Sequence, residues 1–215
     1  MPDLSYEIED AAAVPFAVAP TIGFKLRIDN ANETETIHSV ALRGQIRIEV
    51  TKRRYTPEEQ AGMRDLFGEP ERWSQTLRSL LWTHVSTVVP SFQGTTLTEL
   101  PIPCTFDFNV ATTKYFEGLT AGEIPLHFLF SGTVFYAGAE GVLKVAPISW
   151  EQECKYKLPL RVWREMMDSY YPNTVWLNLR RDAFERLSQY KMRHGIPTWE
   201  EALESMLPVE ETVNS

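Results

Sequence analysis

Apolar and polar residues alternate one by one in several separate segments of this chain. Successive side chains of a β-strand point to opposite faces, so this period predicts strands with one buried and one solvated face. Other short or uniformly apolar segments raise the expected number of strands to about eight. The expected strands cover residues 22–28, 42–50, 81–89, 102–110, 115–116, 124–136, 143–145 and 150–158.

The helical signals are clustered instead of alternating with the strands. Thr56-Pro57-Glu58-Glu59 combines an N-cap residue, a proline at the first helical position and a glutamate three residues after the cap. This capping box predicts a short helical insertion near residues 56–79. After Pro159 the apolar period becomes that of a helix. The expected fold is therefore mainly β with α, as an antiparallel β-sandwich or twisted sheet, and neither a Rossmann fold nor a barrel.

Four regions are expected along the 215 residues. Residues 1–20 are acidic and then rich in Ala and Pro, which predicts an N-terminal arm or a loose first strand. Residues 21–159 form the antiparallel β domain, and residues 160–207 form helices. That helical region is too short for a core of its own, so we expect it to be packed on the sheet. Residues 208–215 are an acidic tail.

The composition favours a protein of the cytoplasm. A net charge of −8 argues against nucleic acid or an anionic membrane as the main partner. The N-terminus lacks a basic and then apolar leader, and no apolar stretch is long enough to insert into a membrane. The two cysteines, Cys104 and Cys154, are not in a CxxC pair, which favours reduced structural thiols over a redox or metal site.

Common catalytic motifs are missing from the sequence. It contains no phosphate-binding glycine loop, no GxSxG and no HExxH. We therefore predict no catalytic, cofactor-binding or metal-binding residue, and favour a non-enzyme. The alternative is an enzyme or small-ligand binder whose site lies between the strands and the C-terminal helices, where pockets often form. Its candidate residues are His84, His127, Asp107 and Cys104.

A protein-binding patch is expected near the second C-terminal helix. Trp176 is followed by Arg180, Arg181 and Arg186, and tryptophan and arginine are frequent in binding hot spots. The competing interpretation is a solvated surface on which these arginines pair with nearby acidic residues such as Asp182. A third hypothesis makes the chain a subunit of a homo-oligomer, assembled through the apolar segment 124–136.

The C-terminal third also carries a recognisable pattern. It comprises Tyr171-Pro172-Asn173-Thr174-Val175-Trp176-Leu177, Leu179-Arg180-Arg181-Asp182, Phe184, Tyr190-Lys191 and Pro197-Thr198-Trp199-Glu200-Glu201-Ala202. With Gly44–Glu49 and the segment around Trp163, this resembles an uncharacterised bacterial family encoded beside actinobacterial-type uptake NiFe hydrogenase genes. The resemblance implies a non-catalytic accessory protein whose partner is a hydrogenase or one of its assembly factors. It assigns a role to no individual residue.

Overall fold

The computed structural model describes residues 2–105, 110–138, 141–174, 177 and 179–207, and these residues form eight strands and several short helices. The strands are β1 (Leu4–Ala13), β2 (Thr21–Asn30), β3 (Ile37–Ile48), β4 (Leu80–Val89), β5 (Thr95–Pro103), β6 (Glu123–Ala137), β7 (Leu143–Pro147) and β8 (Glu153–Pro159). The α-helices are α1 (Pro57–Gly62), α2 (Arg64–Phe67), α3 (Trp73–Thr76), α4 (Val110–Glu117), α5 (Leu160–Tyr170), α6 (Arg181–Arg193) and α7 (Trp199–Glu204), and 3₁₀ turns cover Val50–Lys52 and Pro70–Arg72.

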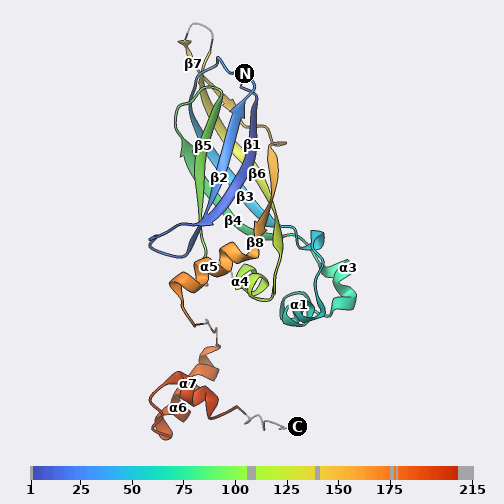
Figure 1. The fold of residues 1–215 in the computed structure, drawn as a ribbon, viewed down its shortest axis with the longest axis vertical. Helices are drawn as coiled ribbons and strands as arrows, with labels where there is room; N and C mark the ends of the chain where they lie inside the picture. Colours follow the sequence, from blue (N-terminus) through green and yellow to red (C-terminus); the bar gives the residue numbers. More distant parts are fainter. Residues whose placement is uncertain (1, 106–109, 139–140, 175–176, 178, 208–215) are drawn as a thin grey trace. The chain divides into compact units, whose positions relative to one another are not determined.

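The strands form two antiparallel sheets (Figure 1). One sheet has the order β1-β2-β5. The other places β3 between β4 and β6, and both β7 and β8 pair with the remaining edge of β6. β8 covers residues 123–129 of β6 and β7 covers residues 133–137, so this edge strand is interrupted. The expected antiparallel β-rich fold is confirmed.

The core lies between the inward faces of the two sheets. Every second residue of β2 is fully buried, as the alternation predicted. The ring of Phe24 packs edge-on against Phe128 of β6 and Trp82 of β4. Trp82 is the extra residue of a β-bulge, because Ile46 pairs with Thr83 and the next residue of β3 pairs with Leu81. The bulge lets Trp82 and Thr83 both be buried.

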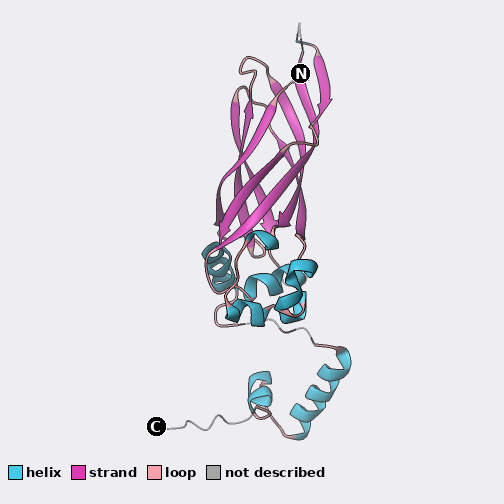
Figure 2. Ribbon diagram, turned by 90° about the vertical axis from the view of Figure 1, so that its right-hand side faces the viewer, coloured by secondary structure: helices cyan, strands magenta, loops and turns pink. Residues whose placement is uncertain are grey.

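Helices α1 to α5 lie at one end of the sandwich (Figures 1 and 2). α1 begins with the expected capping box, in which the Thr56 side chain accepts from the Glu59 backbone and Glu59 accepts from the Thr56 backbone. The helical insertion near residues 56–79 is therefore confirmed. α5 packs against β1, β2 and β8, with Met166 fully buried.

Two sequence expectations between residues 102 and 117 are wrong. The strand β5 ends at Pro103, and Val110 already belongs to α4; residues 106–109 lie outside the described residues. Tyr115 and Phe116, expected in a short strand, are helical. Both are buried although they are adjacent, which a strand with one buried face does not allow. β-branched and aromatic composition suggested strands here, but packing against the sandwich end selects a helix.

The N-terminal segment is better ordered than the arm expected for residues 1–20. β1 runs antiparallel to β2 with Leu4, Tyr6 and Ile8 facing the core. The register shifts between Ile8 and Asp10, so the buried position moves to Ala11 and the simple alternation is lost. The acidic residues stay on the outer face, where Glu9 pairs with Lys25 at 3.0 Å.

The hypothesis of oligomer assembly through residues 124–136 is not supported by the pairing of β6. This strand has β3 on one edge and β7 and β8 on the other, and its apolar side chains fill the core. An oligomer interface through another surface stays a prediction.

The last expected strand, residues 150–158, starts later than predicted. Trp150 precedes β8 and its side chain is exposed.

The chain divides into two compact units, residues 1–173 and 174–215. The second unit contains α6 and α7, which contact each other through Phe184 and Trp199, with ring centroids 5.3 Å apart. Lys191 lies 5.3 Å from the Trp199 ring, and Thr198 caps α7 as expected. Of the expected C-terminal helices, α5 packs on the strands; packing of α6 and α7 on the sheet stays a prediction.

Candidate protein-binding site

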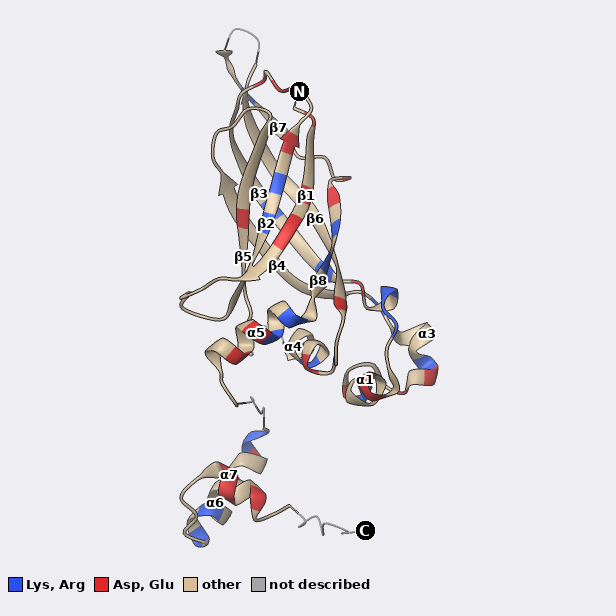
Figure 3. Cartoon of the chain, in the orientation of Figure 1, with Lys and Arg blue, Asp and Glu red and all other residues tan. Residues whose placement is uncertain are grey.

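The loop between β1 and β2 is an exposed apolar segment without a single charged residue. It reads Val14-Pro15-Phe16-Ala17-Val18-Ala19-Pro20. The side chains of Phe16 and Val18 are fully exposed to solvent. In Figure 3 this loop carries neither basic nor acidic colouring, whereas β2 and α5 beside it carry both and β1 carries acidic colouring. Hairpin loops normally use polar residues and glycine, so this composition points to a role in binding.

Several hydrogen bonds hold the apolar loop in one conformation. The Val14 amide donates to the Thr21 carbonyl at 2.8 Å, which closes the loop at its base. The Tyr170 hydroxyl of α5 donates to the Ala17 carbonyl at 2.8 Å, and the Cys104 amide donates to the Pro20 carbonyl at 2.7 Å. A loop fixed before binding loses less conformational entropy when a partner covers it.

Phe16 has an unusual backbone conformation. Its φ is 57°, in the left-handed region that bulky side chains rarely adopt. Strained conformations of this kind cluster at binding and catalytic sites, where the surrounding structure holds them. In this conformation the Phe16 side chain is fully exposed to solvent. An exposed aromatic side chain in such a conformation makes Phe16 a candidate anchor residue for a protein interface.

The arginine patch predicted from the sequence lies in the second unit. Arg180 and Arg186 are exposed, and both contact Asp182, at 3.2 Å and 3.7 Å. These contacts agree with the alternative in which local carboxylates compensate the arginines. Arg181 is also exposed, and Trp176 lies outside the described residues. Partner binding by this patch stays a prediction.

The structure does not bring together the three described candidates for the alternative small-ligand site. His84 and His127 both lie on the outer face of the second sheet, because their neighbours Thr83 and Phe128 face the core. The His127 ring contacts Glu153 at 2.8 Å. Cys104 follows β5 at the helical end, and Asp107 lies outside the described residues.

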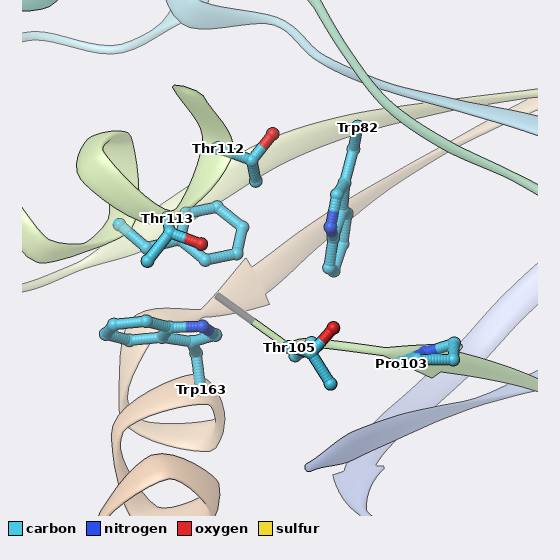
Figure 4. Close-up of a pocket in the computed structure, with 8 residues that line it drawn as sticks. Trp82, Pro103, Thr105, Thr112, Thr113 and Trp163 are labelled. Atoms are coloured by element: carbon cyan, nitrogen blue, oxygen red, sulfur yellow. The ribbon is translucent and has the colours of Figure 1, made fainter. Parts of the chain in front are cut away.

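The junction between the strands and the helices is filled by aromatic side chains. Trp82, Trp163 and Phe116 surround a cavity of about 10 Å³, whose rim includes Pro103 and Thr105 (Figure 4). The Phe116 ring lies 5.3 Å from Trp82 and 5.5 Å from Trp163. Such a volume holds one water molecule at most, so this cavity has no room for an organic substrate.

The cysteines lie in environments that favour the thiol. Burial raises the pKa of Cys104 to about 12 and that of Cys154 to about 11.

Within the described ranges, no group of three or more His, Cys, Asp or Glu side chains is placed to hold a metal ion. None of the described helices combines the length and apolar character needed to cross a bilayer.

The basic run Lys52-Arg53-Arg54 does not form one surface. Lys52 pairs with Glu49 at 3.2 Å, whereas Arg53 is withdrawn from solvent and pairs with Glu59. Only Arg54 of the three has an exposed side chain with no partner among the described residues. Arg53 is therefore part of the internal structure of the helical end, which the sequence does not reveal.

The sequence analysis does not identify the apolar loop, because it treats residues 1–20 as one segment, an arm or a loose first strand. The signal that could have identified it is the uncharged run Val14–Pro20 between two segments with strand-like alternation. An apolar run in that position predicts either a buried connection or an exposed binding loop, and sequence alone does not distinguish the two.

The fold and the loop together define a class: an antiparallel β-sandwich with helices at one end and an exposed apolar loop beside them. The whole chain, residues 1–215, matches a family described as "Family of unknown function (DUF6084)", and the protein belongs to that family. No curated protein is significantly similar to the chain.

Similarity to solved structures is remote. A protein described as late embryogenesis abundant (LEA), studied in solution, shares 14% identity over 74% of this chain and 72% of its own, with a TM-score of 0.33. A structure titled as an ApaA protein from Bordetella pertussis shares 13% identity over 74% of this chain and 95% of its own, with a TM-score of 0.25. At these TM-scores the likeness supports no inference about function.

Proposed function

We propose that this protein is a non-catalytic accessory protein of the cytoplasm that binds another protein through its apolar β1–β2 loop. The observation that carries the proposal is the full exposure of Phe16 and Val18 on a loop that is hydrogen-bonded at its base, to α5 and to the residue after β5. A large apolar side chain held in water gains free energy when a partner buries it. Aromatic anchors of this kind dominate the affinity of protein interfaces.

The proposed partner is a NiFe hydrogenase or one of its assembly factors. The sequence resemblance in the C-terminal third supports this choice. The net charge of −8 is a further consideration, because it disfavours nucleic acid and anionic membranes as competing targets.

Affinity purification from the native host tests both parts of the proposal. Hydrogenase subunits and assembly factors are quantified by mass spectrometry after capture on the full chain and on the double variant Phe16→Ser, Val18→Ser. We expect their recovery to fall by about tenfold or more with the variant, as for loss of a hot-spot residue. A matched control, Val88→Thr with Leu97→Thr, changes two exposed apolar residues elsewhere on the sandwich.

The outcomes separate the loop from the partner. Equal recovery of every protein with the wild type and the loop variant contradicts binding through the loop. Loop-dependent recovery of a protein unrelated to hydrogenase supports the binding mode and contradicts the choice of partner.

A further inference from the structure

The second unit, residues 174–215, does not bury its own apolar side chains. Of its described residues only Ala202 is buried. Trp199, Leu203 and Met206 are exposed and follow one another at intervals of four and three residues, which places them on one side of α7. Phe184 of α6 packs against Trp199 and extends this apolar stripe to the second helix. A pair of short helices needs another surface to cover such a stripe.

The two helices of this unit carry opposite charges (Figure 3). α6 has four basic and two acidic side chains, so its net charge is +2. α7 has three acidic side chains and no basic one, so its net charge is −3. The charged residues are Arg181, Asp182, Glu185, Arg186, Lys191 and Arg193 on α6, and Glu200, Glu201 and Glu204 on α7.

These opposite charges are not paired with each other inside the chain. None of the three glutamates of α7 forms an ion pair with another described residue, although α7 contacts α6 through Trp199 and Phe184. On α6, Arg186 pairs with Asp182 of its own helix at 3.7 Å. Arg181 and Arg193 form no ion pair in the described part of the chain. The unit therefore presents basic and acidic groups together with the apolar stripe.

We propose that the second unit binds the second unit of another copy of this chain, with α6 of each copy beside α7 of the other. A two-fold symmetric contact is self-complementary, so each contact from α6 to the opposite α7 is made twice. A surface with one basic and one acidic helix meets this requirement. A partner of a single charge sign would attract one helix and repel the other. The apolar stripes of the two copies are buried at the centre of this contact.

This arrangement gives the arginines of α6 an acidic partner, namely α7 of the second copy. It uses no residue of the apolar β1–β2 loop, so it is independent of the function proposed above. The competing arrangement packs the stripe on the sandwich of the same chain. That arrangement leaves the chain monomeric, whereas the proposed contact doubles its mass, so the two are distinguished by the mass in solution.

Analytical ultracentrifugation of the full chain over a concentration series measures this mass. We expect the wild type to reach twice the mass of one chain. Leu203→Ser removes part of the stripe at an exposed position and should weaken self-association by about tenfold or more. Val88→Thr is the matched control, because Val88 is an exposed apolar residue of the first unit, and it should leave self-association unchanged.

Charge reversal tests the pairing of α6 with α7. Arg181→Glu with Arg193→Glu changes the net charge of α6 from +2 to −2, so both helices of that variant are acidic. Glu200→Lys with Glu204→Lys changes α7 from −3 to +1, so both helices of the other variant are basic. Each variant alone should be monomeric because like charges face each other. An equimolar mixture should regain the double mass, because opposite charges then meet in both contacts.

Three results overturn the proposal. A wild type that stays at the mass of one chain throughout the series means that the sandwich or another protein covers the stripe. Self-association that survives Leu203→Ser or either charge variant alone means that the copies meet through another surface. A mixture that remains monomeric means that α6 does not pair with α7 of a second copy. Recovery of the double mass in the mixture also establishes that both variants are folded.

Discussion

The guanidinium of Arg53 lies 2.6 Å from the carboxylate of Glu59, and the two side chains are only 11% and 2% exposed. Arg53 also donates to the carbonyl oxygens of Ala121 and Glu123, at 2.6 Å and 2.7 Å. The same Glu59 oxygen accepts from the Thr120 amide at 2.9 Å. This buried pair therefore joins the start of α1 to the turn between α4 and β6, and supports the helical end of the sandwich.

Removing the charge of Glu59 should destabilise the protein strongly. Glu59→Gln leaves Arg53 buried without its counter-charge, so we expect the free energy of unfolding to fall by about 3–5 kcal/mol. Urea unfolding monitored by tryptophan fluorescence measures it. Glu58→Gln is the matched control, because Glu58 is exposed on the same turn, and it should change stability by less than about 0.5 kcal/mol. A loss below about 1 kcal/mol for Glu59→Gln would mean that solvent reaches Arg53.

The stabilisation by Glu59 should depend on pH. Burial raises the pKa of Glu59, but hydrogen bonds from the Thr120 and Thr56 backbone and from Arg53 outweigh it and hold the pKa below its ordinary value of 4.5. A carboxylate with a lowered folded-state pKa stabilises the fold above its unfolded-state pKa, and this contribution is lost as the pH falls through the folded-state pKa. The stability difference between wild type and Glu59→Gln should therefore shrink from about pH 6 to about pH 3. A constant difference over that range would contradict the lowered pKa.

The cysteines should behave as structural thiols. Their raised pKa values keep both protonated at pH 8, so the native protein should react slowly with a disulfide reagent such as DTNB and rapidly after unfolding in urea. Cys104→Ser and Cys154→Ser should each lower stability by about 1–3 kcal/mol, because a hydroxyl replaces a thiol at a mostly apolar site. Partner binding should be unaffected. Fast labelling of the native protein would assign one thiol a reactive role.

Charge reversal tests the arginine patch of the second unit. If Arg180 and Arg181 contact an acidic partner, changing both to Glu should weaken binding and reduce its dependence on salt concentration. Circular dichroism establishes that the fold is kept. Unchanged binding would favour the alternative, a solvated surface on which Arg180 and Arg186 pair with Asp182.

Deletion of residues 174–215 tests whether α6 and α7 pack on the sheet. Docked helices bury apolar side chains such as Phe184 and Trp199, so their removal should lower the stability of residues 1–173 by about 1.5–3 kcal/mol for each side chain uncovered. An unchanged unfolding midpoint for the shortened chain would show that the second unit is independent of the sandwich.

Local patterns predicted most of the strands and the helix starts. β2 shows a strict apolar alternation, and each of its inward residues is buried as expected. Thr56 with Glu59, and Thr198 at the start of α7, are caps that depend only on residues three positions apart. Where this local pattern is broken by a bulge, as near Ile8 and Asp10, the sequence leaves an arm and a loose first strand as alternatives.

The candidate site was much less predictable. The run Val14–Pro20 is visible in the sequence, but one of the bonds that hold it comes from Tyr170, which is 153 residues from Ala17. The Arg53–Glu59 pair is close in sequence, yet its burial depends on Thr120 and Glu123 arriving from β6 and the turn before it. Contacts between segments this far apart leave no mark in the local pattern.

By itself the sequence determined the β-rich class, the helical insertion and the acidic character, because periodicity, caps and net charge are local or summed properties of the residues. Tertiary structure alone decided that Tyr115 and Phe116 are helical, that Phe16 points into solvent and that the Tyr6 hydroxyl is buried without a hydrogen-bond partner among the described residues. Each of these depends on which distant segments pack together, and that packing is selected by the free energy of the whole fold and not by any single segment.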